Sequence, residues 1–231
     1  MRRGSAAGRC SGCGIRQPLC FCALIPRIAL ETRVLVVMHA AEIVLTTNTA
    51  RLAARALTNS EVRIRGRRGQ PLPASGWRRP GRQSLVLYPS GGATELNAEY
   101  LSRLARPVTL IVPDGTWRQA RRIVLREPGL AGVPHVKLPP GQPSEYRLRA
   151  QPNNNGLCTF EAIARAIGIL ESREAQARLE AVFRVMVERT LWTRGRFTAE
   201  ECLAAGVSPQ AVYGRPGQEF AAGHGKGGGS N

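Results

Sequence analysis

The sequence lacks any long apolar run: no stretch approaches the roughly 20 residues that a membrane-spanning helix needs. The N-terminal segment "MRRGSAAGRC" contains arginines but no apolar stretch behind them, so it does not have the pattern of a secretory signal. We therefore expect a cytoplasmic protein that does not enter a membrane. The sequence also contains no P-loop, no G-x-G-x-x-G and no Ser-His-Asp order, which removes support for three large enzyme classes.

Lysine is nearly absent, since 31 of the 33 basic residues are arginine. A genome rich in G and C would explain arginine in place of lysine, but it would not explain 33 basic residues against 16 acidic ones. The resulting net charge of +17 attracts polyanions over a distance. The charge therefore favours a nucleic acid as partner.

The six cysteines are unevenly distributed. Four of them lie close together near the N-terminus: Cys10, Cys13, Cys20 and Cys22. Four thiolates at this spacing suit one tetrahedral zinc ion, and because the protein fills all four positions we expect a structural site. An iron–sulfur cluster uses the same ligands and is the alternative. Cys158 and Cys202 fall in helical patterns and are predicted to be small buried residues.

Apolar runs alternate with helical patterns along most of the chain. Strands are predicted at 33–38, 61–65, 84–88, 108–112 and 135–138. Helices are predicted at 48–57 with Asn48 as a possible cap, at 94–105, 116–126, 158–170 and 173–193, and after the capping box at 198–201. The strands are continuous apolar runs, which predicts an α/β protein with a parallel sheet flanked by helices. A long loop, 66–83, is rich in glycine, proline and arginine, and loops of this length are usually functional or disordered.

The predicted strands end in "YPSGG", "PDGTW" and "LPPG", and ligands bind at the carboxyl ends of parallel strands. Asp114 follows the strand at 108–112, where it can cap the next helix, face a ligand, or do both. Trp117, Ala120 and Val124 form an apolar stripe on that helix, and Trp117 is expected to anchor it to the core. The helix also carries an arginine face, which is either solvated or in contact with phosphates: Arg118, Arg121 and Arg122.

Two other segments place polar residues near strand or helix ends. In "EYRLRAQPNNNGLCTFEA", Arg147 and Arg149 precede a Gly- and Asn-rich loop that opens a helix, which suits an anion or is an ordinary connection with surface arginines. The segment "MHAAEIVLTTNTARL" gathers polar residues around another strand end: His39, Glu42, Asn48, Thr49 and Arg51.

Taken together, these stretches resemble the DTW-domain family of tRNA-uridine aminocarboxypropyltransferases. Five blocks occur in the family's order: "CSGCGIRQPLCFC", "TTNTARL", "VLYPS", "PDGTWRQAR" and "EYRLRAQPNNNGLCTFEA". The Asp-x-Thr-Trp signature here is Asp114-Gly115-Thr116-Trp117, and one departure is Ala50, where we expect glycine. The resemblance covers about residues 9–170.

The resemblance implies a SPOUT-like, knotted domain that binds S-adenosylmethionine. We expect a zinc-binding segment at 1–30, the catalytic domain with its C-terminal helices at 31–215, and a disordered glycine-rich tail at 216–231. The implied activity is transfer of the 3-amino-3-carboxypropyl group of S-adenosylmethionine to N3 of a tRNA uridine. The implied partner is tRNA, and no obligate protein partner is evident.

The resemblance also implies roles for individual residues. Asp114 is the expected base, with Thr116 or a water as relay, and its pKa must be raised for the task. The donor is expected to contact Tyr88, Pro89, Ser90, Gly115, Trp117, Tyr146, Arg147 and Thr159, with Arg147 on its carboxylate. The RNA is expected to contact Arg51, Arg118, Arg121, Arg122 and Arg149.

Two other functions are compatible with the same residues. The first is an RNA methyltransferase that uses the same donor and releases S-adenosylhomocysteine. The second is a non-catalytic, zinc-containing RNA-binding protein. Steep salt dependence of tRNA binding is expected in all three cases and does not distinguish them.

Overall fold

The computed structural model describes residues 8–67, 69–73, 75–149 and 156–207. The glycine-rich tail predicted at 216–231 lies outside these residues. Contacts divide the chain into two compact units, one comprising Ala23–Val187 and the other Met1–Cys22 together with Glu188–Asn231. Among the described residues, no helix combines the length and the apolar character needed to cross a bilayer.

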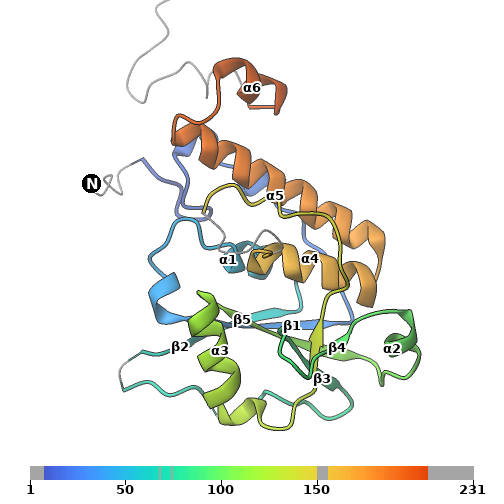
Figure 1. The fold of residues 1–231 in the computed structure, drawn as a ribbon. Helices are drawn as coiled ribbons and strands as arrows, with labels where there is room; N and C mark the ends of the chain where they lie inside the picture. Colours follow the sequence, from blue (N-terminus) through green and yellow to red (C-terminus); the bar gives the residue numbers. More distant parts are fainter. Residues whose placement is uncertain (1–7, 68, 74, 150–155, 208–231) are drawn as a thin grey trace, which may run out of the picture. The chain divides into compact units, whose positions relative to one another are not determined.

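The larger unit is built on a sheet of six parallel strands (Figure 1). The strands are β1 (Arg33–His39), β2 (Ser60–Arg65), β3 (Gln83–Leu87), β4 (Thr94–Glu95), β5 (Val108–Asp114) and β6 (His135–Lys137). Their order across the sheet is β2-β1-β5-β3-β6-β4. The prediction of a parallel α/β sheet is confirmed.

Helices lie on both faces of the sheet (Figure 1). The α-helices are α1 (Ala50–Ala56), α2 (Ala98–Ser102), α3 (Trp117–Arg126), α4 (Thr159–Leu170), α5 (Arg173–Thr193) and α6 (Ala199–Ala204). Short 3-10 turns are η1 (Gln17–Leu19), η2 (Cys22–Leu24), η3 (Ala40–Glu42) and η4 (Pro128–Leu130). Helices α1 and α4 contact one another, and α4 and α3 both contact β5, which is central in the sheet.

The largely apolar runs of β1 and β5 suit their positions inside the sheet, where each strand has a neighbour on both sides. Val34–Met38 are at most 1% exposed, and every residue of β5 is buried. Strands covered on both faces consist mainly of apolar side chains, and the buried polar exceptions here are Arg33, Thr109 and Asp114. In the register of the two strands Met38 pairs with Asp114, so the carboxyl end of β5 lies beside that of β1.

The predicted helix at 94–105 is wrong in its first turn. Thr94 and Glu95 instead form the edge strand β4, which pairs with β6. The side chain of Asn97 then accepts a hydrogen bond from the backbone N–H of Tyr100 and starts α2. A good capping residue three positions inside the helical pattern therefore sets the true start of the helix.

The loop predicted at 66–83 is held to the larger unit by a buried tryptophan. Trp77 is 2% exposed and joins the core cluster that contains Leu35, Ile111 and Ile123. The buried Arg33 guanidinium donates to the Gly76 carbonyl at 3.1 Å and also pairs with a glutamate of β2. This part of the loop is therefore anchored by apolar burial and by a buried charge.

Candidate active site and cysteine cluster

Strand β5 ends in a buried carboxylate whose two oxygens each accept one hydrogen bond. Asp114 is 4% exposed, although its side chain is charged at neutral pH in water. Its Oδ1 accepts a hydrogen bond from the Thr159 hydroxyl at 2.6 Å, and its Oδ2 accepts one from the Asn48 side-chain amide at 2.8 Å. The two donors come from the first turn of α4 and from the segment before α1, so three elements meet at this carboxylate.

Asn48 holds its amide in one orientation. Its Oδ1 accepts from the backbone N–H of Arg51 at 3.3 Å, which helps to start α1, and Nδ2 therefore points to Asp114. The same nitrogen lies 3.5 Å from Oε2 of Glu42, which is also buried. Two buried carboxylates thus share one amide donor.

The surroundings of Asp114 shift its pKa. Burial raises the pKa of Asp114 above its ordinary value, and the neighbouring Glu42 carboxylate acts in the same direction. Hydrogen bonds from Thr159 and Asn48, together with the charge of Arg149, lower the pKa without cancelling that rise. A carboxylate with a raised pKa is a stronger base than one in water, which suits it to accept a proton from a weak acid.

The cap of α3 is Thr116 and not Asp114, which corrects the capping role considered from the sequence. Thr116 Oγ1 accepts from the Gln119 backbone N–H at 3.3 Å, and the Thr116 N–H donates to the Gln119 side chain at 2.8 Å. Because this capping box satisfies the end of the helix, Asp114 is free for other partners. Gly115 separates the two residues at φ 154°, and a Cβ there would lie 3.0 Å from the Cβ of Gln119.

A cavity of about 870 Å³ opens at the carboxyl ends of β5, β3 and β6, within the larger unit. Its size is in the range of small-molecule sites. Trp117 and Tyr88 form an aromatic part of the wall, with ring centroids 6.2 Å apart. Trp117 is 44% exposed, so the expectation that it anchors α3 in the core is wrong. Ala120 and Ile123 form the buried side of that helix.

Most residues expected to bind a donor lie on the cavity wall. The wall includes Tyr88, Pro89, Gly115, Trp117, Tyr146 and Thr159, as well as Asp114 and Thr116. Ser90 and Arg147 are not among the described lining residues. The Ser90 hydroxyl lies 2.8 Å from Nδ1 of His135, and the side chain of Arg147 is exposed.

The arginines expected to contact RNA fall into two groups. Arg118, Arg121 and Arg122 are exposed on α3, and Arg118 also lines the cavity. Arg51 is exposed as well. Arg149 differs, since it lies on the cavity wall and donates to Glu42 at 3.1 Å.

Two buried residues of the site were noticed in the sequence without being assigned to the site: Glu42, and Asn48, which was considered only as a helix cap. A pattern search has no means to find them, because Asn48 lies 66 residues before the carboxylate that it contacts. A signal for the carboxylate itself was present. Asp114 is the only aspartate in the chain, since the other 15 acidic residues are glutamates.

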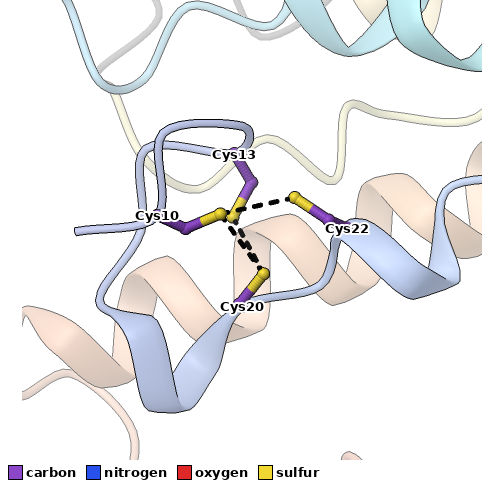
Figure 2. A group of neighbouring side chains, drawn as sticks. All are labelled: Cys10, Cys13, Cys20 and Cys22. Atoms are coloured by element: carbon purple, nitrogen blue, oxygen red, sulfur yellow. Dashed lines mark hydrogen bonds between the residues drawn. The ribbon is translucent and has the colours of Figure 1, made fainter. Parts of the chain in front are cut away.

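The four N-terminal cysteines converge on one point (Figure 2). Sulfur–sulfur distances are 3.4 Å for Cys10–Cys20, 3.5 Å for Cys10–Cys22 and 3.9 Å for Cys13–Cys20, and all four sulfurs lie within 4.8 Å of one another. A tetrahedral ion with metal–sulfur bonds of about 2.3 Å places its ligands about 3.8 Å apart. The cluster therefore fits a four-coordinate metal ion.

The backbone around these cysteines is supported within the smaller unit. The Arg189 guanidinium donates to the carbonyls of Leu19 and Cys20 at 3.0 and 2.7 Å. The side chains of Ile15, Leu19 and Phe21 are also buried. The backbone N–H groups of Cys13 and Gly12 lower the pKa of the Cys10 thiol to about 6, which favours the thiolate that metals bind.

The other two cysteines differ from one another. Cys202 is fully buried in α6, as expected. Cys158 is only partly buried, precedes the first residue of α4 and lines the cavity, so the prediction of a buried helical residue is wrong for it. Burial nevertheless raises the pKa of the Cys158 thiol, which keeps it protonated.

Comparison with known proteins gives a consistent result. The DTW domain model matches residues 7–191. The chain is 32% identical over 169 residues to tRNA-uridine aminocarboxypropyltransferase 2 of Macaca fascicularis, covering 70% of this chain and 56% of that protein. It is 28% identical over 210 residues to tRNA-uridine aminocarboxypropyltransferase A of Arabidopsis thaliana, covering 77% and 79% of the two chains.

A shorter match reaches 41% identity over 91 residues of the Drosophila melanogaster tRNA-uridine aminocarboxypropyltransferase 2, which is 39% of this chain and 36% of that protein. The chain thus spans little more than half the length of the first of these relatives. Among solved structures none matches the chain significantly.

Proposed function

The chain belongs to the DTW-domain family, and on that premise we propose that it transfers the 3-amino-3-carboxypropyl group of S-adenosylmethionine to N3 of a uridine in tRNA. Methylthioadenosine is the second product. The names of the relatives support this activity, and the basic net charge supports a polyanionic acceptor.

The bonds and the proton of this reaction balance as follows. N3 of the uridine forms a bond to the γ-carbon of the donor's methionine part, and the bond between that carbon and sulfur breaks. The bonding pair goes to sulfur, which changes from a sulfonium to a neutral thioether. The proton of N3 goes to Asp114.

The observation that carries the proposal is the buried carboxylate of Asp114 on the wall of a cavity large enough for a donor. Uridine N3–H is a weak acid, so a base must take its proton as N3 attacks. The raised pKa of Asp114 brings this carboxylate closer to that requirement. The hydrogen bonds from Thr159 and Asn48 aim both oxygens and limit the motion of the base.

The aromatic part of the wall suits the sulfur end of the donor. Tyr88 and Trp117 offer ring faces that attract a sulfonium without the strong pairing that a carboxylate would give. Since the positive charge disappears in the transition state, a tight ion pair at sulfur would stabilise the ground state and slow the reaction. Asp114 is already engaged by two donors and is assigned to the base instead.

The exposed arginines of α3 are assigned to tRNA. Arg118 is exposed and lines the cavity, and Arg121 and Arg122 are exposed further along the helix, so a tRNA backbone bound to these arginines would lie beside the cavity. Contacts of this kind position a nucleic acid without reading its sequence.

We assign the four-cysteine cluster to a structural zinc ion, because zinc is bound by four thiolates in tetrahedral geometry and needs no open position here. The boundaries expected from the sequence, 1–30 and 31–215, stay predictions. The SPOUT-type knot also stays a prediction, because strand order and parallel pairing do not by themselves define a knot.

The decisive experiment is to incubate the purified full chain with S-adenosylmethionine and bulk tRNA and to analyse nucleosides and small molecules by mass spectrometry. A uridine heavier by the aminocarboxypropyl group, together with methylthioadenosine, supports the proposal. Formation of a methylated nucleoside and S-adenosylhomocysteine would instead identify a methyltransferase. Binding of tRNA with neither product would support the non-catalytic alternative.

The metal is tested separately on the same preparation. We expect about one zinc per chain by elemental analysis and no visible absorbance, whereas an iron–sulfur cluster would give iron, sulfide and a brown colour. Cys20→Ser should release the metal, and Cys202→Ser, which changes a buried cysteine outside the cluster, should retain it.

A further inference from the structure

The cavity wall contains an ion pair that the proposed chemistry does not use. Glu42 is 4% exposed and lies on the wall beside Asp114. Its Oε2 accepts a hydrogen bond from Nη2 of Arg149 at 3.1 Å. Arg149 also donates from Nε to the Thr47 hydroxyl at 3.0 Å, so both partners are held in place.

Each member of the pair keeps a group available for a ligand. Among the described residues, none donates to Oε1 of Glu42 and none accepts from Nη1 of Arg149. Oε1 of Glu42 is not among the fully buried atoms without a partner, and the Arg149 side chain is 36% exposed. Because both residues line the cavity, these free groups can be reached from it.

The pair is poorly explained as a stabilising element alone. Removing two charges from water costs several kcal/mol per ion, and buried pairs are often replaceable by apolar residues without loss of stability. A second carboxylate so close to Asp114 adds to this cost, since Asn48 Nδ2 contacts both. Fixed charges of opposite sign facing a cavity are what a zwitterionic ligand requires.

We propose that Glu42 and Arg149 bind the amino-acid end of the donor, with Glu42 Oε1 accepting from its ammonium and Arg149 Nη1 donating to its carboxylate. This inference rests on the proposed function, because it takes S-adenosylmethionine as the ligand. It assigns Arg149 to the donor, whereas the sequence suggested Arg149 for RNA and Arg147 for the donor carboxylate.

The placement also accounts for which carbon reacts. The ammonium and the carboxylate are attached to the α-carbon, and the γ-carbon lies two bonds further toward sulfur. A subsite that fixes the α-carbon beside Asp114 therefore brings the γ-carbon, and not the methyl group, toward the base and the uridine. Selection between two electrophilic carbons then follows from where the ligand is held.

The test compares two ligands that differ only in the amino-acid end. S-adenosylhomocysteine and methylthioadenosine are both neutral thioethers, and the second lacks the ammonium and the carboxylate. By titration calorimetry on the full chain, we expect Glu42→Gln and Arg149→Gln to weaken S-adenosylhomocysteine binding about 10- to 100-fold each. Methylthioadenosine binding should change less than about twofold. Arg103→Gln changes an arginine at the C-cap of α2 whose side chain is 76% exposed, and it should alter neither affinity.

A third ligand gives one comparison on the wild-type chain alone and, with the variants, separates the two residues. Decarboxylated S-adenosylmethionine keeps the ammonium and lacks the carboxylate, so the wild-type chain should bind it about 10-fold more weakly than S-adenosylmethionine. Arg149→Gln should not weaken it further, whereas Glu42→Gln should. Thermal unfolding of each variant checks that the comparison is made on folded protein.

Two results would overturn the assignment. The first contradicts only the subsite, and the second also contradicts the proposed function. If wild type binds S-adenosylmethionine but the variants weaken both thioethers equally, or Arg147→Gln produces the loss in place of Arg149→Gln, only the subsite is wrong. If wild type binds neither S-adenosylmethionine nor the thioethers, the proposed function fails together with the subsite.

Discussion

The cavity has two walls that hold their side chains in different ways. Around the end of β5, Asp114, Asn48 and Glu42 are buried and joined by hydrogen bonds. Along α3, Trp117 and the arginines are exposed. The polar side chains of Thr116 and Gln119 at the start of the helix hydrogen-bond to the helix itself in a capping box. The difference suits the two roles that we propose for these walls. Proton transfer needs groups fixed within a fraction of an ångström, whereas attraction of a polyanion needs only charge at roughly the right place.

The largest expected effect comes from changing the buried carboxylate at the end of β5. Asp114→Asn should lower kcat for transfer about 10²- to 10⁴-fold, since the amide cannot accept the uridine proton. The hydrogen bonds can be kept, because the Thr159 hydroxyl can turn to accept from the new amide while Asn48 still donates to its oxygen. Single-turnover kinetics with tRNA measures the loss.

The affinity of that variant for tRNA is the control, measured by filter binding, and it should stay within about twofold of wild type. Turnover that is undiminished would remove Asp114 from the mechanism. A parallel loss of tRNA binding would show that the two walls are not separable.

A second prediction concerns the pKa of the base. The Thr159 hydroxyl lowers the pKa of Asp114 by donating to it, so Thr159→Val should raise that pKa further. The acidic limb of the kcat/KM profile then moves to higher pH, and the rate at neutral pH falls by up to roughly tenfold. The measurement is a pH–rate profile under single-turnover conditions.

Thr116→Val is the matched comparison for that experiment. Its hydroxyl accepts from the Gln119 backbone and donates to no group of Asp114, so its removal should cost about 1 kcal/mol of stability through the lost cap and leave the acidic limb in place. An acidic limb of the pH–rate profile that moves for Thr116→Val and not for Thr159→Val would contradict this prediction and would favour Thr116 as the proton relay.

Substitutions of the exposed α3 arginines should have a smaller effect, and the effect should be on tRNA affinity and not on kcat. Arg121→Gln with Arg122→Gln should reduce tRNA affinity several-fold and lower the slope of log K against log salt by about one for each phosphate that the variant no longer neutralises. The kcat at saturating tRNA should be unchanged. Arg103→Gln, which removes an exposed charge from the C-cap of α2, is the control; an equal change there would mean that net charge alone is responsible.

The same contrast explains what the sequence predicts well. Strands β1 and β5 are continuous apolar runs, and the arginine face of α3 is visible in the helical spacing, so both follow from local pattern. The partners of Asp114 do not follow from a local pattern, because Thr159 and Asn48 lie 45 and 66 residues away in the sequence. Only the sheet register and the placement of α4 bring them together. The family resemblance suggested the role that we propose for Asp114, whereas the ion pair of Glu42 with Arg149 could be found only in the structure.

The smallest expected effect is on stability, and its sign distinguishes a strained base from a structural carboxylate. Because the folded-state pKa of Asp114 is raised, the folded chain binds more protons than the unfolded chain between the ordinary pKa and the raised one. The free energy of unfolding therefore falls as the pH rises through that window, and the charge remains a cost at neutral pH. Asp114→Asn removes this cost.

The Tm of Asp114→Asn should consequently equal that of wild type near pH 4 or below and exceed it at pH 7. A gain of about 1 kcal/mol corresponds to roughly 2–4 °C for a chain of this size. Differential scanning calorimetry over this pH range measures the difference, with Glu99→Gln on the exposed face of α2 as the control that should show none. A Tm that falls at pH 7 would mean that the carboxylate stabilises the fold through its hydrogen bonds. The group around the end of β5 would then have a structural role and not a role in proton transfer.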